Sequence, residues 1–211
     1  MLNKFLKRST SRDRKTRICC PSQFSDPVAM KAEWSPMKDA GNLQTRRLVN
    51  VSPNRLEFRV TLEALCFYLF FLFGGMVPFF LVPWDVLSFR TVVLLLGGVA
   101  MSTAGGYGFY SGTTPIVFDR SRRFFWKGRK EPDALSGTIH QKEHVRFENI
   151  HALQLVTNYS TDGRFDYMYE MNLVLNDGRR IHLVAQRNLI NVRENAGTLS
   201  QFLERPVWDA I

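Results

Sequence analysis

The sequence predicts a membrane protein of the α+β class, in which a two-helix transmembrane hairpin is followed by a small cytoplasmic β-rich domain with a C-terminal helix. Three observations lead to this prediction. Two uncharged runs of about twenty residues lie close together, short alternating runs follow them, and basic residues flank the apolar pair on both sides. The whole chain is only 45% hydrophobic, which is ordinary for a soluble protein. The two uncharged runs therefore show that the apolar residues are concentrated in the middle of the chain.

Residues 1–41 are predicted to form a basic, flexible N-terminal tail. They are polar and basic, contain several serines and prolines, and hold no lasting period of 2 or 3.6. No cleavable signal peptide is expected, because the first residues lack an apolar stretch. Two partly alternating runs separated by Ser52, Pro53 and Asn54 then predict a short β-hairpin over 42–62.

A transmembrane hairpin is predicted over 63–110, with spans at about 64–82 and 91–110. Neither span contains a charged residue, and neither shows a polar stripe. At about 1.5 Å per residue each would be about 28–30 Å long, the thickness of a bilayer's hydrocarbon core. The intervening stretch LVPWDVLSFR is therefore interpreted as the turn between them.

The distribution of basic residues predicts the orientation of the hairpin. Residues 1–62 hold thirteen Lys/Arg against five Asp/Glu, a second basic cluster follows the second span, and the turn contains only Arg90. By the positive-inside rule both ends of the chain lie in the cytoplasm. Glu63 is expected to be interfacial as well. The predicted interfacial anchors are Trp84, Arg90, Tyr110, Arg120, Arg122 and Arg123.

Small residues recur every four positions in the second span. One row comprises Gly98, Ser102 and Gly106, and a second contains Ala104 and Gly108. Two interpretations are open: close packing against the first span near Gly74 and Gly75, or contact with a second copy or another membrane protein. A homo-oligomer or a membrane partner held through this span is thus one expectation.

Residues 111–211 are predicted to form strands followed by one helix. The expected strands lie near 115–118, 124–127, 145–147, 150–156, 167–175 and 180–185. The sequence Asn176-Asp177-Gly178 predicts a hairpin with a two-residue type I′ turn. Asn191 is predicted as the N-cap of a terminal helix that ends before Pro206. Its predicted apolar face comprises Val192, Ala196, Leu199, Phe202 and Leu203.

The runs IVFDRSRRFFWKG, FENIHALQLV and NLVLNDGRRIHLV, which follow the predicted membrane hairpin, carry a resemblance. The chain resembles bacterial membrane proteins that have a PH-like domain behind paired transmembrane helices. The resemblance covers about residues 60–205 and lies in the order of elements. It implies a PH-like fold, and such domains bind peptides, lipids or neighbouring subunits and are rarely enzymes. It also implies a bacterial inner-membrane location.

One stretch has the residue types of a metal site. His140, Glu143 and His144 match H-x-x-E-H, which binds zinc when both histidines lie on one helical face. The flanking residues favour a loop that enters a strand, so no catalytic, metal-binding or cofactor-binding residue is predicted. His151 and His182 are expected to be half-exposed strand residues. The three cysteines, Cys19, Cys20 and Cys66, are expected to be reduced thiols.

The predicted function is therefore a non-enzymatic integral membrane protein whose cytoplasmic domain serves protein or lipid interaction. The formal net charge of +9 is explained by topology and by attraction to anionic membrane lipids, without a specific nucleic acid. Two alternatives remain open. One is a membrane-embedded immunity-type factor that neutralises a toxin, and the other is a zinc-dependent hydrolase using His140, Glu143 and His144.

Overall fold

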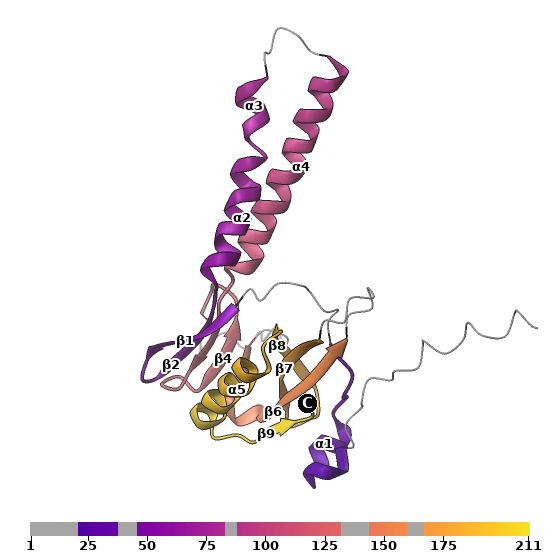
Figure 1. Cartoon of the computed structure of the whole chain (residues 1–211). Helices are drawn as coiled ribbons and strands as arrows, with labels where there is room; N and C mark the ends of the chain where they lie inside the picture. The colour runs from indigo at the N-terminus through magenta and orange to yellow at the C-terminus, as the bar shows by residue number, and fades with distance from the viewer. Residues whose placement is uncertain (1–20, 38–45, 83–87, 132–143, 160–166) are drawn as a thin grey trace, which may run out of the picture. The chain divides into compact units, whose positions relative to one another are not determined.

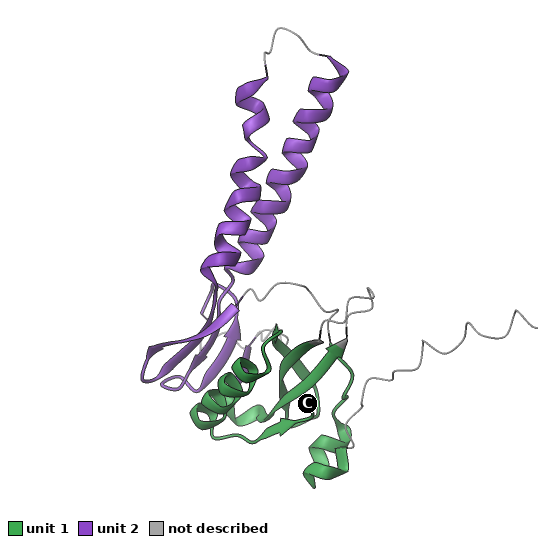
Figure 2. Ribbon diagram, viewed as in Figure 1, with its two compact units in different colours: residues 1–42, 147–211 green, residues 43–146 purple. Residues whose placement is uncertain are grey.

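The computed structural model describes residues 21–37, 46–82, 88–131, 144–159 and 167–211 (Figure 1). These residues form two compact units (Figure 2). Residues 43–146 make one unit, which contains the apolar helices, and residues 1–42 and 147–211 make the other. The predicted α+β class, with two apolar helices followed by β sheets, is confirmed.

The unit of residues 43–146 is built on a five-stranded antiparallel sheet. Its strands lie in chain order: β1 (Arg46–Ser52), β2 (Arg55–Val60), β3 (Ile116–Asp119), β4 (Phe124–Lys127) and β5 (His144–Arg146). Residues 42–62 and 111–211 are not the separate domains predicted from the sequence, because β2 pairs directly with β3, with Leu56 opposite Phe118. The apolar helices are therefore an insertion between two neighbouring strands of one sheet.

Alternation explains why these strands form a sheet with one apolar face. Phe58, Phe118 and Phe125 are fully buried, and the ring centroids of Phe118 and Phe125 are 5.0 Å apart. The residues that alternate with Phe58 along β2, Glu57 and Arg59, form an ion pair of 2.8 Å on the other face.

The inserted helices are α2 (Leu62–Gly74), α3 (Val77–Leu81) and α4 (Phe89–Gly112). The stretch from Leu62 to Leu81 and α4 are long and apolar enough to cross a membrane, and few of their residues are buried. The first predicted span is not one continuous helix. It breaks after Gly74, because Pro78 has no N–H to donate to the carbonyl four residues earlier.

The second unit contains a four-stranded sheet in the order β8-β7-β6-β9. Its elements are η2 (Phe147–Asn149), β6 (Ile150–Tyr159), β7 (Tyr167–Leu175), β8 (Arg180–Gln186), α5 (Leu189–Leu203) and β9 (Val207–Asp209). β6, β7 and β8 are antiparallel, and β9 returns parallel to β6. Leu153, Leu155 and Leu173 alternate along the strands and are fully buried on one face.

Helix α5 contacts β7, β8 and β9. Four of the five residues predicted for its apolar face are buried: Val192, Ala196, Leu199 and Leu203. The prediction of Asn191 as N-cap is wrong. The cap is Asn188, whose side chain accepts hydrogen bonds from the N–H groups of Ile190 and Asn191, 2.9 and 3.3 Å away. Both Asn188 and Asn191 are good N-cap residues. Because β8 already ends at Gln186, the helix can begin at the earlier of the two.

The turn between β7 and β8 also differs from the prediction. A type I′ turn needs positive φ at both central residues, yet of the three turn residues only Gly178 has one, at +87°. The N–H of Gly178 donates to the carbonyl of Leu175 at 2.9 Å. The connection is therefore a three-residue loop with glycine in the left-handed position, and the prediction that Gly178 needs positive φ is confirmed.

Residues 21–37 cover the other face of the second sheet, opposite α5 (Figure 1), and we call them the strap. The strap contains η1 (Pro21–Phe24) and α1 (Pro27–Lys31). This stretch lies within the predicted flexible tail of residues 1–41, but Ala29, Ala32 and Trp34 are buried against the sheet. A five-residue helix followed by an irregular segment has no lasting period, so alternation along the sequence does not reveal its packing.

Candidate functional site

The strap is anchored to the sheet by an aromatic cluster. The Trp34 indole stacks on Phe24 with ring centroids 5.1 Å apart and planes 4° from parallel. Its other neighbour is Trp208 of β9, at 5.8 Å. The indole N–H donates to the carbonyl of Ala29 at 2.9 Å, which satisfies the buried polar atom. Trp34 is thus the main apolar contact between strap and sheet.

On either side of Trp34 the sheet contacts the backbone of the strap at alternate residues. The Gln154 amide donates to the carbonyl of Glu33 at 3.0 Å, and the Arg180 guanidinium donates to the carbonyl of Ser35 at 2.7 Å. The N–H of Met37 then donates to the Glu170 carboxylate at 2.9 Å. All three contacts are made by side chains of β6, β7 or β8, and all three are directed at main-chain groups. These three contacts therefore hold the strap through its backbone, and Arg180 adds an ion pair of 3.2 Å with the Glu33 carboxylate.

The groups that make these contacts are deeply buried. Glu170 is 0% exposed and also accepts a hydrogen bond from the Asn158 amide at 3.1 Å. The Arg180 side chain is 5% exposed, and burial lowers the pKa of its guanidinium although Glu33 and Glu170 act in the opposite direction. Burying charges is costly, and such groups regain hydration when they are uncovered. Releasing the strap therefore costs less free energy than uncovering an apolar surface of the same area.

A second polar contact holds the strap where α1 begins. Asp26 caps α1 by accepting from the N–H of Val28 at 2.8 Å, and its other oxygen lies 2.7 Å from Nε2 of His151. Partial burial acts to raise the pKa of Asp26, but the hydrogen bonds from His151 and Val28 outweigh it and hold that pKa below the ordinary 3.8. His151 in β6 and His182 in β8 are both half-buried strand residues, as predicted.

Asn172 lies between these contacts in the centre of β7. Its side chain is fully buried, and its carbonyl oxygen is 3.2 Å from Nδ1 of His182. The Asn172 amide nitrogen has no hydrogen-bond partner among the described residues. The sheet side chains that face the strap thus include several polar ones: His151, Gln154, Asn158, Glu170, Asn172, Arg180 and His182.

The predicted small-residue face of α4 lies partly against the first apolar stretch. A β-carbon on Gly98 would be 2.5 Å from the carbonyl oxygen of Gly75, and the Ser102 hydroxyl donates to the carbonyl of Leu72 at 2.9 Å. Gly106 has only ordinary contact with this stretch, and Ala104 is exposed. A β-carbon on Gly105 would clash with the α2 backbone, and one on Gly108 with the Tyr68 ring. The contact thus includes Gly98, Ser102 and Gly108 of the predicted rows and adds Gly105 and Gly112, so its residues are three or four positions apart.

The predicted interfacial anchors divide into three groups. Trp84 lies outside the described residues, and Arg90 is exposed in the first turn of α4. Tyr110 lies at the other end of α4, with the Arg129 guanidinium 4.5 Å from its ring centroid. Arg120, Arg122 and Arg123 form the turn after β3, at the end of the strand away from α4. A strand of four residues places that turn about 10 Å farther along the chain, which does not favour an anchoring role.

The possible zinc motif is only partly described. His140 and Glu143 lie outside the described residues, whereas His144 begins strand β5 and pairs with Trp126. The zinc motif requires a helix there, so this strand does not favour it. Within the described ranges no group of three or more His, Cys, Asp or Glu side chains lies close enough to hold a metal ion. Cys66 is an exposed free thiol, and the other two cysteines are outside the described residues.

Sequence reasoning misses the residues of the strap contact. Glu170 and Asn172 alternate with apolar residues along β7, a pattern that is typical of a strand with one face in solvent. Nothing in that alternation shows that another segment of the chain covers the polar face. No protein-family model matches this chain, and no curated protein matches it either.

Proposed function

We propose that this chain is a non-enzymatic integral membrane protein whose cytoplasmic domain, of the PH-like type, binds a peptide segment of a protein partner. The observation that carries the proposal is the strap. Side chains of three neighbouring strands contact the backbone of residues 33, 35 and 37, and a tryptophan anchors the segment beside them. The strap of the same chain then occupies the site, and a partner's aromatic-containing segment binds there when it replaces the strap.

The apolar helices support the membrane part of the proposal. Large side chains such as Phe70 and Phe80 are 66% and 79% exposed, so the described residues leave most of their surface uncovered. An uncovered apolar surface of this kind is typical of a membrane-facing or partner-facing segment. Since both helices are inserted between β2 and β3, the hairpin starts and ends at the same sheet, as a cytoplasmic domain on a membrane hairpin requires.

Two features support a PH-like domain. The described residues form an antiparallel sheet of five strands and a sheet of four strands, in which β6, β7 and β8 are antiparallel and β9 is parallel to β6. A helix follows the last strand of the β6–β8 meander. This is the element order of the resemblance noted in the sequence.

The test uses the full-length chain in detergent and a fluorescent peptide with the sequence of residues 21–37. Trp34→Ala in the chain weakens the strap and uncovers the site, since removal of a buried tryptophan costs about 3–5 kcal/mol. We expect saturable binding of the peptide by the Trp34→Ala chain and at least about tenfold weaker binding by the parent, whose strap competes. Met30→Ala, at a 63% exposed position of α1, is the matched control and should behave like the parent.

A second pair of measurements assigns the site. Adding Arg180→Ala to the Trp34→Ala chain should abolish most of the binding, because the guanidinium contacts the peptide carbonyl. A peptide with alanine in place of its tryptophan should also bind poorly. Failure of the folded Trp34→Ala chain to bind the peptide would refute the proposal, with near-ultraviolet circular dichroism as the check on folding.

A further inference from the structure

Four arginines stand where the five-stranded sheet meets the apolar helices. Arg46 and Arg47 begin β1, Arg59 is next to last in β2, and Arg129 follows β4. We call these four residues the arginine rim. We propose that the rim binds the phosphate group of an anionic phospholipid. This inference rests on the membrane insertion proposed above and is independent of peptide binding.

Two of the rim residues are fixed to the end of α4. The Arg46 guanidinium donates to the carbonyls of Thr114 and Ser111 at 2.7 and 3.1 Å. That of Arg129 donates to the Tyr110 carbonyl at 3.2 Å and the Thr113 hydroxyl at 2.7 Å. Positive side chains at a helix C-terminus satisfy its last carbonyls and oppose the negative end of its dipole. The rim is thus held at the level where the apolar helix ends.

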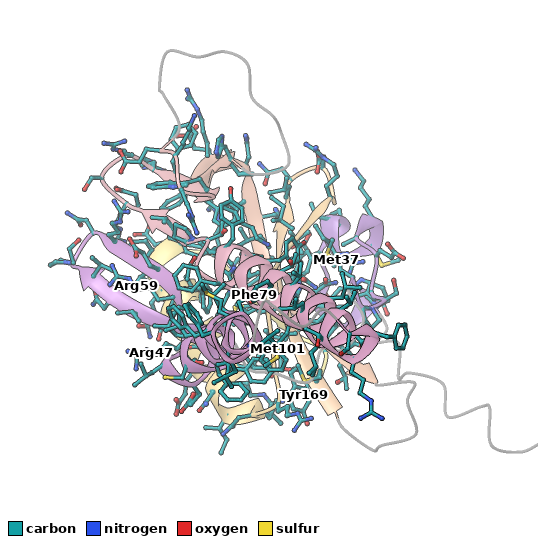
Figure 3. The ribbon with its side chains drawn as sticks, turned by 90° about the horizontal axis from the view of Figure 1, so that it is seen from above. Met37, Arg47, Arg59, Phe79, Met101 and Tyr169 are labelled. Atoms are coloured by element: carbon teal, nitrogen blue, oxygen red, sulfur yellow. The ribbon has the colours of Figure 1, made fainter. Side chains whose placement is uncertain are left out.

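The other two rim residues form a like-charged pair. Arg47 and Arg59 lie directly opposite each other in the β1–β2 register, on the same face of the hairpin. Figure 3, which looks along the helices, shows both on one flank of them. Like charges in directly opposed positions are destabilising, because their Cβ atoms are only about 4.5–5.5 Å apart. An anion placed between them would remove that repulsion.

Hydrogen-bond capacity at this pair supports the same inference. Arg59 is oriented by Glu57, whose carboxylate accepts from its Nε at 2.8 Å. Among the residues that the structure describes, no acceptor is bonded to the terminal nitrogens of Arg59 or to the Arg47 guanidinium. Guanidinium groups bind phosphate oxygens in bidentate fashion, so two of them at this spacing suit one phosphate.

The surroundings favour a lipid as the source of the phosphate. Leu62, which begins α2 three residues after Arg59, is 71% exposed, and Tyr110 is 63% exposed. Inorganic phosphate has no apolar part that could cover these side chains, whereas the acyl chains of a phospholipid would cover them. The headgroup region of a bilayer would also lie at the helix ends, where the rim stands.

The experiment is native mass spectrometry of the full-length protein in micelles that contain phosphatidylglycerol or phosphatidylcholine. The parent should retain phosphatidylglycerol, and Arg47→Gln with Arg59→Gln should weaken retention about tenfold. The matched control is Arg122→Gln with Arg146→Gln, which removes the same two charges from exposed positions at the far end of the same sheet. It should retain lipid like the parent.

Three outcomes would overturn the proposal. One is equal loss in both double variants, since net charge alone would then explain retention. Another is equal retention of phosphatidylcholine by the parent. The third is displacement of the lipid by millimolar inorganic phosphate, which would assign the rim to a soluble phosphate. Failure of membrane insertion itself would appear separately, as release of the protein from native membranes by alkaline carbonate.

Discussion

Gly75 and Gly98 are in backbone contact where the first apolar stretch breaks against α4, and a β-carbon on either would lie 2.5 Å from the carbonyl oxygen of the other. The glycine pair therefore sets how closely the two helices approach. Helices in a bilayer associate mainly through such close packing of small residues. Gly98 is therefore packed against the first apolar stretch within the hairpin.

Replacing Gly98 with leucine should force the helices apart and destabilise the hairpin by about 2 kcal/mol, the usual cost of overpacking. Its neighbour provides the control, because a β-carbon on Gly97 would meet nothing within 4 Å. Disulfide crosslinking between cysteines placed in the two stretches, on a Cys66→Ser background, measures the separation. Equal crosslinking yields for Gly98→Leu and Gly97→Leu would show that the close approach does not matter.

Gly178→Val should destabilise the unit that contains the strap by about 1–2 kcal/mol. Valine is poorly tolerated at a φ of +87°, and its β-carbon would also lie 3.1 Å from that of Lys31 in the strap. Urea denaturation of the protein in detergent gives the change. Gly197→Ala, where a β-carbon meets nothing within 4 Å, should be neutral or stabilising and is the control. An unchanged midpoint for Gly178→Val would contradict the turn geometry.

Acid should loosen the strap through Asp26. The pKa of this carboxyl is lower when the strap is docked than the ordinary 3.8, so its contribution to docking is complete above about pH 4 and is lost as the pH falls through the docked pKa. Asp26→Asn keeps a good N-cap but removes the charge, so its docking should depend less on pH below 4. Proteolysis of residues 21–37 at several pH values, in both proteins, measures this difference. Identical profiles would exclude the Asp26–His151 contact as the cause.

The orientation of the hairpin has its own test. A reporter fused after Ile211 should be active only in the cytoplasm, because basic residues are concentrated in the strands that flank both ends of the helices. Paired fusions to alkaline phosphatase, which is active outside, and to a fluorescent protein that matures inside give the answer. Phosphatase activity from the Ile211 fusion would contradict the predicted topology.

The sequence by itself determined the elements whose pattern is local. Uncharged runs identify the apolar helices, alternation identifies β6, β7 and β8, and the positions of Val192 and Leu199 identify the buried face of α5. Each depends on residues a few positions apart, within reach of a period of 2 or 3.6. The need for positive φ at Gly178 in the β7–β8 loop could be predicted for the same reason, because it depends on the local turn alone.

Only the tertiary structure decided which segments cover one another. The contact of Gln154, Glu170 and Arg180 with the strap joins residues more than a hundred positions apart, and no local period encodes such a pairing. The pairing of β2 with β3 across the inserted helices likewise assembles the arginine rim from strand ends distant in sequence. Polar side chains on a strand look solvent-facing until another part of the chain lies over them, and that covering is a property of the folded molecule.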